Sequence, residues 1–511
     1  MLASQRSHPA GFTQSSRTRG LRLLAGVAVV GALSASAPLR AETISQALVK
    51  AYGANPDLNS QRANVRAVDE NVGRASAGWR PRLNGSVDAG FEYSDIRATS
   101  PATNPGGSVN GLTLGNSNPS ALASATAAGN GSVRSVAGVA RYTGNPRGVG
   151  FTAQQTLFDG NKTYNSVRQA ESQVFGARES MRVTEQNILL NAASAYMNVL
   201  RDTAILNLRR SNILVLEEQL RQTRDRFQVG EVTRTDVAQA DASLAQSRSD
   251  FFAAQSILQA SIANYRQVVG SEPKRLDPAQ TVERLLPRRL SDAVEISQVE
   301  HPAIATALHQ VDVAALAVKV AEAALLPTAT LNGAVNQRAD FNGIPGYRAL
   351  TASVVGQVSI PLYQGGGEYA SIRQAKEQVS QARLNADLAR DQVRASLVTA
   401  WGSLEASKAQ IASGQAAVAA AEIALNGIRE EAKVGQRTTF DVLNAQQVLL
   451  NTRVVLVTAQ RDRVVGSYSV LASMGRLSVD TLGLSVAVYD PTIHFDQVKG
   501  KLFGTTTPDG R

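Results

Sequence analysis

Apolar residues follow the periodicity of long helices over two large parts of the chain. After Gly365 they recur every seven positions, with alanines between them, at Ile372, Val379, Ala386, Val393 and Ala400. A stripe at alternating three- and four-residue steps follows, at Phe440, Leu443, Leu450, Val454, Val457, Val464, Tyr468 and Leu471. No proline interrupts residues 147–272 or 362–490. These patterns predict long helices that pack closely as coiled coils.

Other segments alternate with the two-residue period of β-strands. Residues 83–93 and 350–362 have one apolar and one polar face, and shorter alternations occur at 149–158 and 328–336. A half-buried sheet of a soluble protein would show the same pattern. However, each strand pair leads directly into helices about 100 Å long at ~1.5 Å per residue, and no other globular element is left for a sheet to cover. The combination favours strands of an outer-membrane barrel.

The chain contains two copies of one unit. The closest match aligns Val229-Gly230-x-x-Thr233-x-x-Asp236-Val237 with Val434-Gly435-x-x-Thr438-x-x-Asp441-Val442. Each copy has the order helix, strand, loop, strand, long helix, turn, long helix. The first copy has an insertion at 97–148, which is rich in Gly, Ser, Asn, Ala and Thr and predicts a long loop.

This duplication divides the chain into five segments. Residues 1–41 have the basic flank, apolar run and small-residue end of a secretory signal peptide. The segments that follow are a first repeat at 42–270 with its loop at 97–148, a linker at 271–290, a second repeat at 291–475 and a C-terminal tail at 476–511. The signal predicts export from the cytoplasm.

Composition excludes several kinds of chemistry. The 511 residues include no Cys and only four His, which are scattered, so the sequence offers no disulfide, thiolate or metal cluster. We find no phosphate loop and no nucleophile constellation, and therefore expect neither enzyme activity nor a cofactor. The net charge of +10 falls to +5 without the signal peptide, and we assign it no role with nucleic acid.

The predicted fold class is mixed, with an α-helical coiled-coil barrel and a transmembrane β-barrel. Four strands per protomer cannot close a barrel, and open sheet edges are not tolerated in lipid. Two chains would supply eight strands, whose interior fills with side chains, whereas three supply twelve and leave room for a lumen. We therefore expect a homotrimer.

These features together resemble the TolC family of outer-membrane channel proteins, over nearly all of residues 42–475. The resemblance rests on the duplication, on Pro81 and Pro327 at strand ends, on the strand exits ending at Phe158 and Tyr363, and on the two turns. It implies a trimeric tunnel from the outer membrane of a Gram-negative bacterium into the periplasm. The implied partners are outer-membrane lipid, a periplasmic adaptor (membrane fusion) protein and an inner-membrane pump. The tail resembles members that serve type I secretion.

The resemblance also implies a gate at the two turns, whose tips are Gly230 and Gly435. Asp441 matches an acid of the entrance ring, and Arg437 matches a base that ties neighbouring hairpins by contacting the acid at Asp236. Asn444 stands where a second ring Asp is found in the family, and Ala432 where a Tyr belongs to the lock. These two departures predict a less acidic ring and a looser lock.

Simpler interpretations remain open at this point. Asp236 and Asp441 are also what the helix dipole favours in the first turn of any helix. A periplasmic adaptor has long helical hairpins too, although usually one hairpin inserted into a small β-domain. A structural coiled-coil filament would explain the helices but not the alternating strands.

Overall fold

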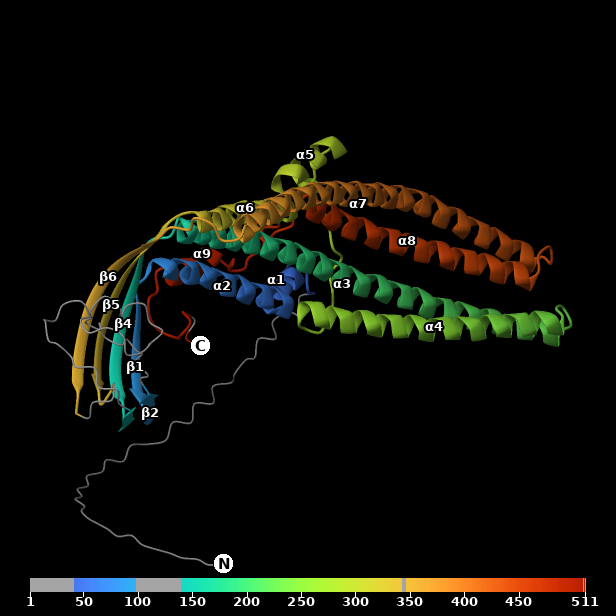
Figure 1. Cartoon of the computed structure of the whole chain (residues 1–511). Helices are drawn as coiled ribbons and strands as arrows, with labels where there is room; N and C mark the ends of the chain where they lie inside the picture. The colour runs from blue at the N-terminus through green and yellow to red at the C-terminus, as the bar shows by residue number, and fades with distance from the viewer. Residues whose placement is uncertain (1–40, 98–138, 342–345, 509, 511) are drawn as a thin grey trace, which may run out of the picture. The chain divides into compact units, whose positions relative to one another are not determined.

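Two long helical hairpins and a sheet form the main body of this computed structural model, which describes residues 41–97, 139–341, 346–508 and 510 (Figure 1). Glu42–Arg511 forms one compact unit. The expected signal peptide lies, except for its last residue, outside the described residues. The helices are α1 (Ile44–Ala54), α2 (Pro56–Ser76), η1 (Ala77–Trp79), α3 (Lys162–Gln228), α4 (Arg234–Val269), η3 (Glu283–Leu285), α5 (Leu290–Glu300), α6 (Pro302–Glu322), η4 (Ala323–Leu325), α7 (Gly367–Lys433), α8 (Thr439–Ser473) and α9 (Pro491–Val498). The strands are β1 (Arg82–Ala89), β2 (Glu92–Arg97), β3 (Val139–Gly144), β4 (Arg147–Phe158), β5 (Thr328–Ala339) and β6 (Arg348–Ser359).

The long helices form where the sequence predicts them. α3 and α7 have 67 residues each, and α4 and α8 return along them with 36 and 35 residues (Figure 1). The seven-residue stripe of α7 is buried at Ile372, Val379, Ala386, Val393 and Ala400. Phe440, the first residue of the stripe predicted in α8, is exposed instead. Thr439 and Val442 in the same first turn of α8 are buried, so Phe440 lies on the outward side of that turn.

Strands and helices follow one another in the same lateral order. The four-stranded sheet has the order β1-β4-β5-β6. Helix α2 packs on α3, α3 on α6, and α6 on α7, and these four helices lead into or out of the four strands in turn. One sheet therefore continues, strand by strand, into one layer of helices.

The antiparallel register sorts the side chains of the sheet onto two different faces. Gly85, Phe151, Val335 and Ala352 lie opposite one another across the four strands, and the neighbouring row is Ser86, Gly150, Asn336 and Thr351. None of the apolar core clusters formed by the described residues includes a strand residue. The apolar face of the sheet is thus left uncovered in the single chain, unlike a half-buried soluble sheet.

Two details of the predicted strands were wrong. The segment 83–93 is not continuous, because β1 ends at Ala89 and β2 begins at Glu92, pairing with β3 in a separate two-stranded sheet. Gly90 N donates to Pro146 O at 2.9 Å where the first sheet gives way to the second. The loop expected at 97–148 is also too long at its C-terminal end, because β3 and the start of β4 lie within it. Of its remainder, residues 98–138 lie outside the described residues.

Long-range polar contacts hold the middle of the molecule together. The hydroxyl of Tyr196, on α3, contacts Glu42 O at 2.7 Å and Asp277 O at 2.6 Å, so α3 meets both the start of the first repeat and the linker. Burial raises the pKa of Tyr196 above its usual range, which keeps this hydroxyl protonated as a donor. The C-terminal tail packs against the same core through Leu477 and Val479.

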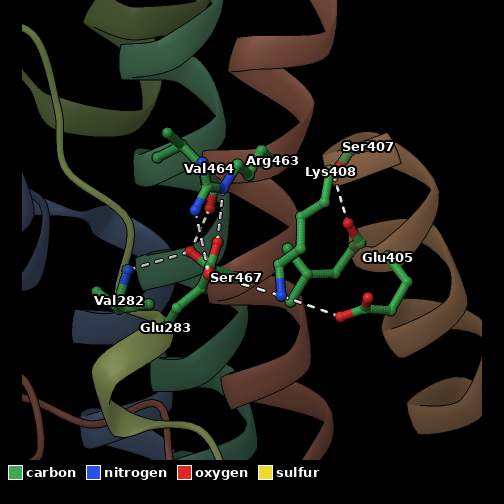
Figure 2. A network of polar contacts seen from close by, with 9 residues as sticks. Val282, Glu283, Glu405, Ser407, Lys408, Arg463, Val464 and Ser467 are labelled. Carbon is green, nitrogen blue, oxygen red and sulfur yellow. Dashed lines mark hydrogen bonds and ion pairs between the residues drawn. The ribbon is translucent and has the colours of Figure 1, made fainter. Parts of the chain in front are cut away.

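The linker at 271–290 is fixed to the second hairpin by a polar network (Figure 2). The Glu283 carboxylate accepts from Arg463 Nε at 2.8 Å, on α8, and lies 3.5 Å from Lys408 Nζ, on α7. Lys408 also donates to Glu405 at 2.9 Å, and Val282 N donates to the Ser467 hydroxyl at 3.2 Å. The hydrogen bond from Arg463 is the main reason why the pKa of Glu283 lies below its usual range.

Replacing Glu283 by Gln is expected to lower the stability of the folded protein at neutral pH by at most about 1 kcal/mol, because the partners are partly exposed. A carboxyl whose pKa is depressed by folding stabilises above its unfolded pKa, about 4.3 for Glu, and loses this contribution as pH falls through the folded value. The variant should therefore differ from wild type at pH 7 and converge with it at acidic pH. Thermal unfolding followed by circular dichroism measures this. Glu405→Gln is the matched control, since it touches Lys408 but not the linker; an equal effect of both changes would contradict the prediction.

Candidate functional site at the two helix-to-helix turns

The candidate site consists of the two turns that join α3 to α4 and α7 to α8, at the ends of the hairpins far from the sheet (Figure 1). Both turns have the same backbone geometry. Gly230 has φ +82° and Gly435 has φ +79°. Glu231 N donates to Arg226 O and Gln436 N to Glu431 O, each at 2.9 Å, which satisfies carbonyl groups at the helix ends.

These glycines are required by conformation and not by space. A Cβ added at either Gly230 or Gly435 would meet no atom within 4 Å. A left-handed backbone nevertheless disfavours any other residue, by about 1–2 kcal/mol. The sequence-based placement of both glycines at the tips agrees with this geometry.

Asp236 and Asp441 cap the returning helices α4 and α8. The Asp236 carboxylate accepts from the backbone N–H of Thr233 at 2.8 Å and from its hydroxyl at 2.7 Å. Asp441 does the same with Thr438, at 3.0 and 2.8 Å. These hydrogen bonds hold the pKa of Asp441 below its usual range, so the group is ionised at neutral pH. Each acid therefore has a capping role within its own chain.

Arg437 has a partner that the sequence analysis missed. Its Nε donates to Glu431 Oε2 at 2.7 Å, across the tip of the same turn. Among the residues that the structure describes, no hydrogen bond or ion pair joins Arg437 to Asp236. The first turn has the reverse arrangement, with Arg226 on the helix and Glu231 in the turn, 2.7 Å apart. Each tip glycine has a basic residue on one side and an acidic residue on the other in the sequence, and this pattern could have predicted the two ion pairs.

The two departures from the family pattern differ in their surroundings. Ala432 is buried in the second hairpin, in a cluster with Leu425, Val442 and Leu449. Asn444 is exposed on α8. Ala432 therefore contributes to packing between α7 and α8, whereas Asn444 is available to a neighbouring surface.

A chain of side-chain hydrogen bonds crosses all four long helices above the turns. Arg429, on α7, donates to Gln446 Oε1 at 3.1 Å, and Gln446, on α8, donates to Asn212 Oδ1 at 3.1 Å. Asn212, on α3, in turn donates to the Ser247 hydroxyl on α4 at 3.1 Å. Asn212 and Ser247 are buried. We call Arg429, Gln446, Asn212 and Ser247 the four-helix chain; it joins one hairpin to the other.

An apolar contact between the hairpins lies beside this chain. Leu443, on α8, is buried in a cluster formed otherwise by the first hairpin, namely Leu216, Leu220, Ala240 and Leu244. Since Leu443 comes two residues after Asp441, this packing fixes the start of α8 against the first hairpin. The two turns are thus held in a defined relation by one apolar and one polar contact.

The predicted strand-end residues lie at junctions between sheet and helices. Pro81 is between η1 and β1, Pro327 is between η4 and β5, and Phe158 is the last residue of β4. Tyr363 lies in the connection from β6 to α7 and is exposed. All four therefore lie at the same boundary, where each strand meets a helix.

A sheet of amphipathic strands that continues into two long helical hairpins defines the class of outer-membrane channel proteins. The crystal structure of the Campylobacter jejuni CmeC outer membrane channel has this fold, with a TM-score of 0.69, 16% sequence identity and coverage of 89% of both chains.

The chain belongs to the outer membrane efflux protein family, whose model matches residues 47–271 and 294–476. It is 42% identical over 489 residues, 96% of each chain, to the outer membrane efflux protein BepC of Brucella suis. It is 25% identical to the outer membrane protein TolC of Escherichia coli, over 92% of this chain and 89% of that one. The alkaline protease secretion protein AprF of Pseudomonas aeruginosa is 27% identical, over 61% of this chain and 66% of that one. The protein is therefore an outer-membrane channel protein that extends into the periplasm, in a family of channels and not of enzymes.

Proposed function

We propose that the protein is a homotrimeric channel-tunnel that forms the outer-membrane exit duct of a tripartite export system. The observation that carries the proposal is the four-stranded sheet, whose apolar face is uncovered and whose strands continue into the helices. The names of BepC and AprF concern efflux and protease secretion, which supports type I protein secretion, drug efflux or both as the export served.

The edges of the sheet support the proposed trimer. β1 and β6 are its outer strands, and their free edges need partners in a membrane. Pairing β6 of one copy with β1 of the next closes a barrel of twelve strands from three copies, wide enough for a lumen. The polar rows of the sheet then line that lumen, and rows such as Gly85, Phe151, Val335 and Ala352 face lipid.

The strands are assigned as the membrane-spanning elements in preference to helices. Two helical stretches, Leu290–Leu325 and Gly367–Lys433, are long and apolar enough to cross a membrane by composition. The first is interrupted at His301-Pro302, and α7 packs along α6 and α8. Only 17% and 6% of the most apolar parts of these two stretches are buried in the single chain, so we attribute their apolar character to helix packing between copies in the trimer and keep the strands as the part in lipid.

The gate is proposed at the two turns. In a trimer, three Asp441 carboxylates around the axis concentrate negative potential and favour cations. Arg437 is proposed to tie neighbouring protomers by reaching Asp236 of the next copy, which requires it to exchange its present contact with Glu431. Asn444 in place of a second acid makes the ring less negative.

The proposed partners act at the same end of the tunnel. An inner-membrane pump supplies the energy and a periplasmic adaptor joins it to the duct, while the channel itself needs no cofactor. The outer membrane efflux protein model matches both repeats of the chain. This match supports a channel over the two alternatives from the sequence, a periplasmic adaptor and a coiled-coil filament.

The test is mass measurement and single-channel conductance on one purified, reconstituted preparation. We expect three copies per particle and small, cation-selective openings. Asp441→Asn should reduce the ratio of cation to anion permeability roughly two- to fivefold, because it removes the ring charge. The hydrogen bonds from Thr438 lower the pKa of Asp441 and keep it ionised at neutral pH, so the selectivity of wild type should be present at pH 7 and be lost as acid protonates the ring.

The control for the capping role is Asp236→Asn, which alters an identical capping box on the other hairpin. It also removes the proposed partner of Arg437, so it should change how often the channel opens but not its selectivity. If Asp441 is only a helix cap, both variants change stability alike and neither changes selectivity. A monomer or dimer that shows no conductance would contradict the channel itself.

A further inference from the structure

The C-terminal segment follows α2 toward the membrane boundary. His494 Nδ1, on α9, lies 2.9 Å from Asp69 Oδ2, and both side chains are buried. Four residues further on, Val498 O lies 3.7 Å from the position of a Cβ on Gly73. Next, Lys501 O accepts a hydrogen bond from Arg80 Nη1 at 3.0 Å. The order of these contacts shows that tail and helix run in the same direction, toward β1.

Helix α9 is held firmly enough to fix this direction. Phe495 packs with the apolar cluster formed by α2 and α3, and the Arg178 guanidinium lies 5.2 Å from the centre of its ring. Arg178 also donates to Pro491 O at 3.5 Å. The tail beyond α9 therefore starts from a helix that is packed against α2 and α3.

The contact at Arg80 places the tail at the start of the lipid-facing sheet. Arg80 precedes Pro81 and β1, whose apolar residue Val87 is 81% exposed in the single chain. Directly after Lys501 come Leu502 and Phe503, which are 64% and 88% exposed. Two large apolar side chains are thus presented next to the point where the apolar strand face begins.

The charges around these side chains fit a phospholipid surface. Arg80 and Arg82 lie at the start of β1, and Lys499 and Lys501 lie in the tail, where Lys499 Nζ pairs with Asp496 at 3.0 Å and Lys501 Nζ donates to Thr506 O. Aromatic residues flanked by Lys and Arg are typical of membrane–water interfaces, where the ring enters the acyl boundary and the cations face phosphate groups. A large apolar pair that is exposed among the residues the structure describes, and that lies beside a membrane-spanning strand, fits lipid as its occupant.

We propose that Leu502 and Phe503 form an interfacial anchor, which inserts into the periplasmic phospholipid leaflet of the outer membrane. Lys501 holds the anchor in place through its backbone contact with Arg80. The tail then braces the outside of the helical tunnel against the membrane in which the barrel sits. This inference rests on the proposed membrane-spanning barrel.

The absence of cysteine makes the anchor directly testable by spin labelling. A nitroxide at Phe503→Cys, in the full mature protein reconstituted in phospholipid vesicles, is probed by collision with oxygen and with a water-soluble nickel complex. We expect the oxygen-to-nickel accessibility ratio to exceed that at Val488→Cys, a tail position 53% exposed before α9, by about fivefold or more. Val87→Cys on β1 is the reference for lipid.

The possible outcomes separate failure of the proposed anchor from failure of the proposed barrel. A lipid-like ratio at Val87 with a water-like ratio at Phe503 overturns the anchor and leaves the barrel intact. Low accessibility of Phe503 to both reagents places it against a neighbouring copy and also overturns the anchor. A water-like ratio at Val87 overturns the barrel, and the anchor with it. Leu502→Cys repeats the measurement at the adjacent residue, so the result does not depend on one label.

Discussion

Replacing Gln446 by Leu is expected to shift the channel strongly toward its conducting state. Gln446 is the member of the four-helix chain that joins the second hairpin to the first, through its bond to Asn212 at 3.1 Å. Leucine keeps the helix and a similar side-chain volume but removes both hydrogen-bonding groups. Asn212 keeps its bond to Ser247 and loses the donor at its buried oxygen.

The magnitude follows from the proposed trimer. One hydrogen bond contributes about 1 kcal/mol net. If opening separates the hairpins, three copies of this contact favour the closed state by roughly 3 kcal/mol, so their loss raises the ratio of open to closed channels about 100-fold. Open probability in planar bilayers, at fixed salt and voltage, measures the change.

The adjacent glutamine supplies the control. Gln447 lies on the exposed side of α8 and, within the described part of the chain, bonds to Asn451 alone, one turn further along its own helix, at 2.9 Å. Gln447→Leu should leave the open probability near that of wild type. Equal effects of the two substitutions would show that the four-helix chain does not resist opening.

Gly475→Ala is expected to destabilise the protein more than the same change at Gly270 or Gly435. Gly475 follows the C-cap of α8 with φ +81°, and a Cβ there would lie 2.7 Å from His301 Cα and 3.0 Å from Pro302 Cδ. These are atoms at the break between α5 and α6, where the backbone cannot easily move. Strain of about 1–2 kcal/mol and overpacking of about 1–3 kcal/mol together predict a loss of roughly 2–5 kcal/mol per chain.

The other two glycines share the backbone geometry and form a graded series of controls. Gly435 has φ +79° but open space around it, so Gly435→Ala should cost only the conformational term, about 1–2 kcal/mol. At Gly270 the added Cβ would lie 3.4 Å from Ala54 Cβ, an ordinary contact. The unfolding temperature of the reconstituted Gly475→Ala variant should therefore be well below the unfolding temperatures of the other two variants. Equal unfolding temperatures would refute the role assigned to the contact with His301.

The predicted helices and turns were accessible from sequence because their causes are local. The seven-residue stripe through Ile372, Val379 and Ala386 is a property of one segment, and its burial is confirmed. The same holds for the tip glycines and for the Thr-x-x-Asp capping boxes, whose bonds span three residues. The strand alternation also located the sheet, although it did not reveal the break at Gly90.

The relations between distant segments were decided only by the tertiary structure. His494 meets Asp69, and Gln446 meets Asn212, across separations of 425 and 234 residues, which no periodicity specifies. Such polar pairs form only after helix packing has fixed which faces meet.

The sequence by itself thus determined the elements, their duplication and the chemistry of each turn, because periodicity, capping and backbone conformation act over a few residues. The tertiary structure decided the lateral order α2-α3-α6-α7 over β1-β4-β5-β6, the four-helix chain and the course of the tail along α2. These features depend on which buried surfaces fit together, and that is a property of the whole chain.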